Sequence, residues 1–220
     1  MDGRTIEDRL REEYFDLLPE IRRVAWQLEA EIRFYTLPIL RDLKSHEQLV
    51  IKARVKECDS ALNRVVRLTT RSGRRREVDP KEGEGRIFDP ERPEDYSMLD
   101  LEDLAGVRIL AFPNTRVAEI DDLLRKHFAG WTYKPVKDDF GSVLAPKYFG
   151  YRTDLSSKVR GEYQVVPMLL GLFWEVEHAA MYKFRAVARS KVMRGHRAEV
   201  EVALARFEAG IESFLSNNPQ

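Results

Sequence analysis

The chain has 220 residues and a mass of 25.7 kDa, which is enough for one large domain or a compact domain with a helical arm. Its 37 basic and 37 acidic residues cancel, which excludes a globally basic coat for nucleic acid as its main feature. A single cysteine, Cys58, excludes a disulfide framework and a cysteine-built zinc site. The sequence has no apolar run of about 18 residues and no signal core near Met1, so we expect a soluble cytoplasmic protein without a membrane partner.

The N-terminal region, residues 5–44, has apolar residues at a spacing close to 3.6, which predicts helix. Pro19 fits a first-turn position, so we expect two helices here, or one helix with a break before Pro19. Pro38 should interrupt the second helix. We interpret the region as an arm for packing or for contacts in a homo-oligomer.

Strands and helices alternate through the rest of the chain. Apolar runs and alternation predict strands at residues 49–55, 105–112, 131–136, 151–159 and 162–166. Helical spacing predicts helices at residues 57–68, 117–128, 168–184 and 197–215. Residues 71–84 have glycines and charge without periodicity, so we expect a loop there. This order favours a sheet that carries helices on its faces.

Two clusters of charged residues lie at or near the first two predicted strands. Arg54, Lys56 and Arg64 surround a strand-to-helix turn, where they would form either a phosphate cradle or a solvated basic edge. Asp103 precedes a buried strand, so it is either a Mg²⁺ ligand or an ordinary turn residue. Arg108 lies within that apolar strand, so its charge needs a partner there or its side chain must project from a face of the sheet.

Two further groups lie in the second half of the chain. Tyr151 follows a glycine, with Lys147 nearby, so its ring either stacks on a base or packs in the core. Glu162 and Gln164 share one face of a strand and are either exposed edge residues or the lining of a cleft. The sequence has no P-loop, no HExxH motif and no Ser-His-Asp order, which disfavours P-loop kinases, zincins and triad hydrolases.

In order and spacing, these segments resemble the synthetase domain of RelA/SpoT proteins, in particular the stand-alone small alarmone synthetases. The resemblance runs from about residue 49 to residue 183, and its most specific parts are DLAGVRI at 103–109, GY at 150–151, EYQV at 162–165 and WEVEHAAMYK at 174–183. It implies an α+β, nucleotidyltransferase-like fold with a mixed five-stranded sheet flanked by helices. We expect an N-terminal helical arm at 1–45, a synthetase core at 46–184 and a C-terminal helix at 185–220.

The resemblance also implies a reaction, the transfer of pyrophosphate from ATP to the 3′-hydroxyl of GDP or GTP with Mg²⁺, giving (p)ppGpp as in the stringent response. On the ATP side, Arg54 and Arg108 match arginines that flank the adenine. Lys56 matches a phosphate-binding lysine, and Arg64 stands where a second lysine is usual. Asp103 matches the Mg²⁺-binding aspartate.

On the acceptor side, Tyr151 matches the tyrosine that stacks on guanine, and Lys147 the lysine before the glycine-tyrosine pair. Glu162 matches the glutamate that takes the acceptor proton or helps to hold the metal, and Gln164 is placed with the nucleotide-binding residues. Phosphoryl-type transfer needs mainly alignment and charge neutralisation, which these residue types supply.

The sequence departs from the family mainly on the acceptor side. The family's histidine four residues after the stacking tyrosine is Leu155, its arginine-threonine pair is Val166-Pro167, and its guanine-reading asparagine or histidine is Gly171. The loop before Gly150 reads Tyr148-Phe149 where the family has proline-asparagine. Loss of hydrogen-bonding groups changes base selectivity.

Two alternatives therefore stay open. The first is a toxin-type enzyme that acts on adenosine nucleotides or the 3′ end of tRNA, with an antitoxin partner. It is favoured by six basic residues between Lys183 and Arg197 without an acidic one. The second is a catalytically silent nucleotide-binding regulator.

Overall fold

The computed structural model describes residues 5–71, 74–77, 94, 96–138, 141–151, 157–183 and 191–217. Its helices are α1 (Ile6–Tyr35), α2 (Leu37–Arg41), α3 (Cys58–Arg67), α4 (Asn114–His127), α5 (Met168–Lys183) and α7 (Lys191–Asn217), with a 3₁₀ turn at Met98–Asp100. Its strands are β1 (Gln48–Val55), β2 (Leu68–Arg71), β3 (Arg74–Glu77), β4 (Ala105–Phe112), β5 (Thr132–Tyr133), β6 (Val136–Lys137), β7 (Val143–Ala145), β8 (Lys147–Gly150) and β9 (Gly161–Pro167).

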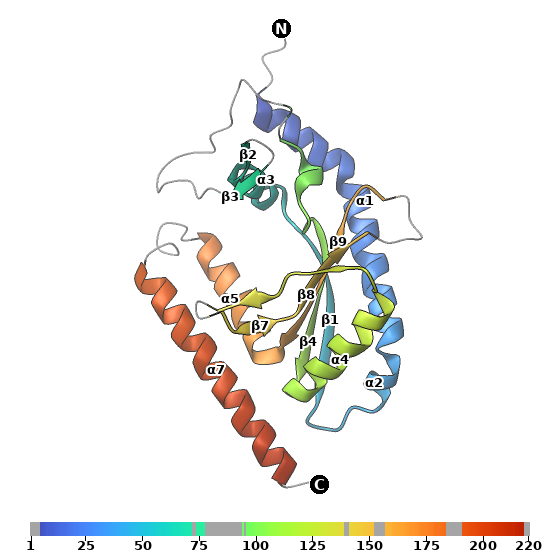
Figure 1. Ribbon diagram of the computed structural model, residues 1–220, viewed down its shortest axis with the longest axis vertical. Coiled ribbons are helices and arrows are strands. Elements are labelled where there is room, and N and C mark those ends of the chain that lie inside the picture. The colour runs from blue at the N-terminus through green and yellow to red at the C-terminus, as the bar shows by residue number, and fades with distance from the viewer. Residues whose placement is uncertain are drawn as a thin grey trace. The chain divides into compact units, whose positions relative to one another are not determined.

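The main sheet has five strands in the order β1-β4-β9-β8-β5, with β9 in the middle (Figure 1). Two smaller ribbons, β2-β3 and β6-β7, each have two strands. This architecture confirms the predicted mixed five-stranded sheet flanked by helices. The central position of β9 explains why its residues 161–166 are all buried.

Helix α1 corrects the prediction of a break before Pro19, because it continues through that residue. An internal proline removes one helical hydrogen bond and costs about 3 kcal/mol. The apolar face of the helix offsets this cost, since its side chains on both sides of Pro19, among them Leu10, Tyr14, Ile21 and Val24, are buried in a hydrophobic core. The interruption at Pro38 is confirmed, because α1 ends at Tyr35 and α2 begins with this proline in its first turn.

Three other segments differ from the sequence-based expectations. The predicted loop at 71–84 contains β3, which pairs with β2, and residues 78–84 lie outside the described residues. The predicted strand at 131–136 is instead divided between β5 and the start of β6.

The predicted strand at 151–159 is wrong for its described residues, and the strand lies earlier, at β8. Ser157 Oγ and the Lys158 N–H both donate to Glu20 Oε1 on α1, at 2.6 and 2.8 Å. The polar groups of this segment are therefore bound to a helix side chain, which lies far away in the sequence. These hydrogen bonds also hold the pKa of Glu20 below its usual value, against the effect of burial, with the Ser157 hydroxyl contributing most.

The chain forms two compact units. The first contains residues 1–29, 53–107 and 149–162, and the second contains residues 30–52, 108–148 and 163–220. The core of the first unit gathers the α1 side chains named above with Leu62, Met98, Leu104 and Val159. A core cluster of the second contains Leu110, Ala145, Val166, Leu170 and Trp174. The division into an arm at 1–45, a core at 46–184 and a helix at 185–220 stays a prediction.

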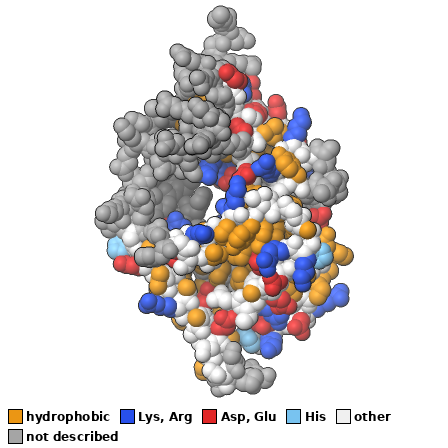
Figure 2. Space-filling view, in the orientation of Figure 1, with side chains coloured by type: hydrophobic (Ala, Val, Ile, Leu, Met, Phe, Trp, Pro, Cys, Tyr) orange, Lys and Arg blue, Asp and Glu red, His pale blue; other side chains and the backbone are white. Residues whose placement is uncertain are grey.

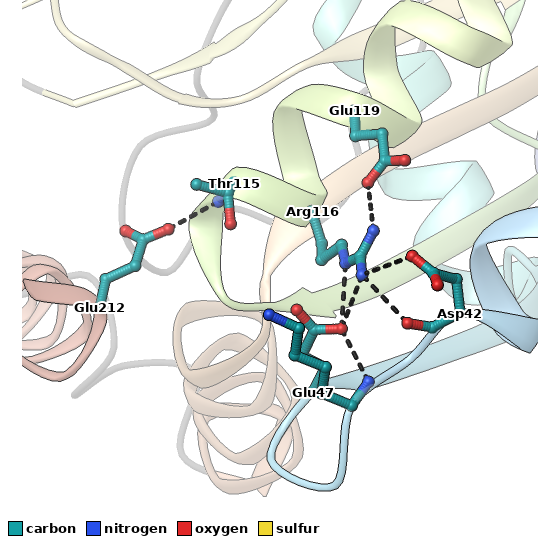
Figure 3. A network of polar contacts seen from close by, with 7 residues as sticks. Asp42, Glu47, Thr115, Arg116, Glu119 and Glu212 are labelled. Carbon is teal, nitrogen blue, oxygen red and sulfur yellow. Dashed lines mark hydrogen bonds and ion pairs between the residues drawn. The ribbon is translucent and has the colours of Figure 1, made fainter. Parts of the chain in front are cut away.

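In the second unit, Arg116 fixes the connection between α2 and β1 to α4 (Figure 3). Its guanidinium donates to Glu47 at 2.8 Å, to Glu119 at 2.6 Å and to the carbonyl of Asp42 at 3.3 Å. Burial alone would raise the pKa of Glu47, but hydrogen bonds from Arg116 and from the Lys44 N–H outweigh it and lower that pKa. In the described part of the chain, no helix combines the length and apolarity needed to cross a membrane.

Candidate active site

Lys56 and Asp103 form an ion pair in the first unit. The Lys56 Nζ lies 2.6 Å from Asp103 Oδ2, with the two side chains 21% and 31% exposed. The lysine backbone is fixed as well, because its N–H donates to the carbonyl of Leu104 at 2.9 Å and its carbonyl accepts from the Tyr14 hydroxyl at 2.7 Å. Burial of that hydroxyl raises the pKa of Tyr14, so it remains a donor. The Lys56 backbone is thus held in place, and the ion pair is still accessible to solvent.

Glu162 lies over a glycine of the neighbouring strand. It is 6% exposed, on β9, and a Cβ added at Gly106 of β4 would lie 3.5 Å from the Glu162 Cβ and 3.9 Å from its Oε1. The two residues therefore face the same side of the sheet, and an added Cβ would touch the Glu162 side chain and lie 3.3 Å from the Glu162 carbonyl oxygen, which is a tight contact. Because Glu162 is buried on the middle strand, the alternative of an exposed edge residue is wrong.

The structure brings the two predicted carboxylates into one unit. Asp103 precedes Gly106 by three residues, which limits the separation of their Cα atoms to about 11 Å. Glu162 is in direct reach of Gly106, so both acids belong to the same region of β4 and β9.

Asp103 and Glu162 supply the donor type that Mg²⁺ takes, since this ion binds one or two carboxylates and completes its shell with phosphate oxygens and water. Among the described residues there is no group of three or more metal-binding side chains, so the protein alone offers no closed cage for an ion. In the structure the Lys56 ammonium, itself a cation, lies on the Asp103 carboxylate. A metal bound by Asp103 would release this ammonium to phosphate oxygens.

The other two cations of the predicted phosphate cradle, Arg54 and Arg64, come before and after Lys56 in the sequence. Arg54 is exposed on β1, and within the described residues no hydrogen bond or ion pair of its guanidinium is found. Arg64 is half-buried on α3, the helix that follows. The first unit thus carries the three basic residues at the end of β1 and on α3, and their grouping into a phosphate cradle stays a prediction.

Tyr151 presents an aromatic surface in the first unit. Its ring is 47% exposed, so the alternative of a core aromatic is wrong. The guanidinium of Arg160 lies 5.1 Å from the ring centroid, and its Nη1 donates to Glu102 Oε1 at 2.7 Å. Hydrogen bonding to Tyr151 and the charge of Glu102 raise the pKa of Arg160, so it remains charged. An exposed aromatic ring with a cation against it is suited to stacking on a base.

Arg108, Lys147 and Gln164 lie in the second unit. The Arg108 guanidinium lies 6.0 Å from the centroid of the Trp174 ring, which supplies the partner that a charged residue in an apolar strand needs. Lys147 is half-buried at the start of β8, and Gln164 is 8% exposed on β9. The edge alternative is therefore wrong for Gln164 as well.

Two of the divergent acceptor positions lie in the apolar core of the second unit. Val166 is fully buried. A Cβ at Gly171 would lie 2.2 Å from Leu110 Cδ2, so the packing of α5 on β4 leaves no room there for the asparagine or histidine of the family. Leu155 lies outside the described residues. Among the six basic residues at 183–197, the side chain of Arg197 is described, and it pairs with Glu201 at 3.0 Å and Glu177 at 3.5 Å.

Sequence reasoning missed several residues of the first unit: Tyr14, Glu102, Gly106 and Arg160. Gly106 carries a local signal, because a glycine within a buried strand indicates close approach of another group. Glu102 and Arg160 carry none, since an acidic turn and a basic residue before Gly161 are each common. Their pairing depends on a contact across 58 residues.

Comparison with known proteins supports the fold. No family model and no curated protein matches the sequence. Among solved structures, small alarmone synthetase 1 from Bacillus subtilis with its product pppGpp has a TM-score of 0.65 at 14% identity, over 95% of this chain and 100% of that one. The same protein with AMPCPP has a TM-score of 0.59 at 15% identity, over 94% and 100%. A GTP pyrophosphokinase family protein from Streptococcus pneumoniae has a TM-score of 0.54 at 16% identity, over 93% and 92%.

At these identities the comparison establishes a shared fold. The matches extend over nearly the whole of each chain, so the likeness includes the terminal helices as well as the sheet. The chain therefore has the small alarmone synthetase fold that its motifs predict.

Proposed function

We propose that the chain is an ATP-dependent nucleotide pyrophosphokinase that transfers pyrophosphate from ATP to the 3′-hydroxyl of GDP or GTP, making (p)ppGpp in the cytoplasm. The observation that supports the proposal is that, in one unit of an alarmone synthetase fold, Lys56 pairs with Asp103 while Glu162 lies beside Gly106, three residues further along the chain. Neighbours with this fold hold pppGpp and AMPCPP, which are the product and donor types that the proposal requires.

The donor would be bound through its phosphates and its adenine. Lys56 and Arg64 would neutralise phosphate oxygens, and Arg54 would lie beside the adenine. The adenine contact of Arg108, a residue of the second unit, stays a prediction from the resemblance. Asp103, with help from Glu162, would hold Mg²⁺, which neutralises charge that develops on the phosphates. The Lys56 backbone is held in place, and its ammonium would then leave the Asp103 carboxylate and bind a phosphate oxygen instead.

The acceptor base would stack on Tyr151. The nucleotide contacts of Lys147 and Gln164, residues of the second unit, stay predictions from the resemblance. A Glu162 oxygen would accept the proton of the 3′-hydroxyl, whose oxygen bonds to the β-phosphorus of ATP. The bond from that phosphorus to the α,β-bridging oxygen breaks, and AMP leaves. A general base of this kind contributes roughly 10²–10⁴-fold to the rate.

The test is an assay of the purified chain with Mg²⁺, γ-labelled ATP and separate acceptors: GMP, GDP, GTP, adenosine nucleotides and tRNA. We expect labelled product with GDP or GTP, and a loss of at least about 10²-fold with Glu162→Gln, because glutamine cannot take the proton. Glu199→Gln, a change at an exposed glutamate of α7, is the matched control and should retain full activity.

Two other outcomes of this assay would contradict transfer to GDP or GTP, and each would indicate a different function. Transfer to adenosine nucleotides or to tRNA would indicate the toxin-type activity, whose antitoxin partner would then be sought. Binding of ATP without transfer to any acceptor, unchanged by Glu162→Gln, would indicate a silent regulator.

A further inference from the structure

The first half of α1 is hydrogen-bonded to segments of the first unit that lie far away in the sequence. The Tyr14 hydroxyl donates to the Lys56 carbonyl at 2.7 Å, across 42 residues. Glu13 Oε1 accepts from the Ser97 hydroxyl at 2.5 Å and from the Met98 N–H at 3.1 Å. The Met98 N–H lies in the first turn of the 3₁₀ helix, where N–H groups have no partner within the helix. The Glu13 carboxylate therefore satisfies a donor that its own segment leaves open.

A third contact lies two turns further along α1. Glu20 comes seven residues after Glu13, so the two carboxylates lie on the same side of the helix. Glu20 Oε1 accepts from the Ser157 hydroxyl at 2.6 Å and from the Lys158 N–H at 2.8 Å. Both glutamates are half-buried, whereas Asp16, between them in the sequence, is exposed. Other acidic and basic side chains lie at the surface in the upper right of the space-filling view, where α1 begins (Figure 2).

Each of the three contacts lies at or shortly before a residue of the candidate active site. The first holds the backbone of Lys56 itself. Met98 precedes Asp103 by five residues, and Lys158 precedes Glu162 by four. One helix thus contacts all three segments that carry the proposed phosphate-binding lysine and the two proposed carboxylates.

The short links between these contacts and the carboxylates are packed in the core. Leu101 and Leu104, on either side of Asp103, are 3% and 1% exposed, and Val159, before Glu162, is 2% exposed. All three apolar residues belong to the same core cluster as the buried side chains of α1. Closely packed segments move together. A change in the contacts with α1 would therefore displace the two carboxylates as well.

We propose that α1 is a positioning helix, whose three side-chain contacts set where the reacting groups of the candidate active site lie relative to one another. Tyr14 positions Lys56, and the two half-buried glutamates position Asp103 and Glu162. This inference rests on the proposed function, because phosphoryl transfer depends mainly on the alignment of the groups that bind and activate the substrates. It gives α1 a role in the reaction in addition to its role in packing.

The first test removes the hydroxyl of Tyr14. Tyr14→Phe keeps the buried ring, and we expect kcat/KM for ATP to fall about tenfold, because a shift of about 1 Å in a binding group is enough for such a loss. The KM for the acceptor should not change. Thr36→Val is the matched control, since it removes a buried hydroxyl that donates to the Ile32 carbonyl at the end of the same helix. It should leave both parameters unchanged.

The second test compares two substitutions at each glutamate. Glu20→Ala leaves the Lys158 N–H without its acceptor, and we expect kcat to fall about tenfold, whereas Glu20→Gln keeps an oxygen acceptor and should stay within about twofold of the native chain. Glu13→Ala and Glu13→Gln should differ in the same way. Asp16→Ala, at the exposed acid of the same helix, is the control and should retain full activity.

Double-mutant cycles separate positioning from general support of the fold. If Tyr14 acts through Lys56, Tyr14→Phe causes no further loss of transfer in a Lys56→Met chain. By the same argument, Glu20→Ala causes no further loss in a Glu162→Gln chain. Losses that simply add would show that the groups act independently, and they would overturn the proposal.

Amide hydrogen exchange tests the contacts without any substrate. Tyr14→Phe should speed exchange of the Lys56 N–H, which donates to the Leu104 carbonyl, and should leave that of Lys158 unchanged. Glu20→Ala should do the reverse. Exchange that rises equally at both amides, or at neither, would overturn the proposal. A native chain that shows these local changes but transfers no pyrophosphate would refute the proposed function alone, with α1 still shown to hold these segments.

Discussion

At the scale of single residues, the position of the proposed general base depends on a neighbour that has no side chain. The Glu162 carboxylate lies beside Gly106, where any Cβ would come within 3.3 Å of the Glu162 carbonyl oxygen and 3.5 Å of its Cβ. Both atoms belong to the middle strand of the sheet, which limits how far they can move. A side chain added at Gly106 would therefore press on Glu162.

We expect Gly106→Ala to reduce pyrophosphate transfer about tenfold and Gly106→Val to reduce it at least about 10²-fold. Displacement of a reacting group by about 1 Å is enough for a loss of this size, and the branched valine pushes further toward the Glu162 oxygen. Overpacking should also lower the free energy of unfolding of the valine variant by about 1–3 kcal/mol. Steady-state kinetics and urea unfolding of each variant measure the two effects.

The matched control for this prediction is Gly195→Ala on α7, where an added Cβ meets nothing within 4 Å. It should leave transfer unchanged and stabilise the helix by up to about 1 kcal/mol. Full activity in Gly106→Val would show that Glu162 does not depend on the glycine.

Arg160 is the second residue whose role depends on a contact. It lies against one face of the Tyr151 ring and is held by Glu102, so it orients the ring on which an acceptor base would stack. We expect Arg160→Ala to raise the KM for the acceptor about tenfold, which corresponds to about 1.4 kcal/mol of lost stacking and ordering. Arg160→Lys should recover part of this loss, because lysine can pair with Glu102 but cannot stack as a plane.

The distinguishing measurement is the split between kinetic parameters. The kcat and the KM for ATP should change less than about twofold in Arg160→Ala. Arg125→Ala, which removes an exposed arginine paired with Asp122 in the second unit, is the control and should change none of the three. An equal rise in the KM for ATP would contradict a role confined to the acceptor.

At the scale of elements, α7 contains a titrating group that links its attachment to pH. Glu208 is 2% exposed, and its burial raises the pKa of the carboxyl, with the Glu212 charge adding to the rise and the Leu169 N–H opposing it. A pKa that is higher in the folded than in the unfolded chain gives stability that is present below the unfolded value. This stability is lost as the pH rises through the folded value.

We therefore expect the stability of Glu208→Gln, relative to the native chain, to increase between pH 4 and pH 7. Glutamine keeps an oxygen for the Leu169 N–H and carries no charge to desolvate. The difference should grow by about 1.4 kcal/mol for each unit by which the Glu208 pKa is raised. Urea unfolding across this pH range measures it, with exposed Glu199→Gln as the control. A pH-independent difference would show that Glu208 does not titrate in this range.

Helices and strands were predictable from the sequence where the local spacing of apolar residues determines them. The bounds of β4 agree with the eight-residue apolar run, and α3 and β1 follow from helical spacing and from alternation. The course of α1 through Pro19 was not predictable, because the packing that outweighs the proline comes from distant residues. The shift of a strand from 151–159 to β8 has the same cause, since Glu20 binds the segment across 137 residues.

At the scale of the whole molecule, the chain order of the charged motifs predicted the fold, in which Lys56 pairs with Asp103 and Glu162 lies beside Gly106. Motifs carry this information because they combine residue type with spacing. The contacts that shape the site, Gly106 with Glu162 and Arg160 with Tyr151, join segments that have no common pattern. Such contacts appear only once the strands have been placed next to one another.

The two compact units are joined through continuous elements, since the chain passes between them inside α1, β1, β4, β8 and β9. A strand cannot be ordered over half its length without leaving its other sheet hydrogen bonds unmade, so the units should unfold together in urea. The measurement compares Cys58 thiol reactivity, which reports on the first unit, with the fluorescence of Trp131 and Trp174 in the second, in a Trp26→Phe background. We expect the thiol and fluorescence transitions to coincide, because neither unit contains all the residues of the main sheet. A thiol that becomes reactive well before the fluorescence changes would show that the first unit unfolds alone.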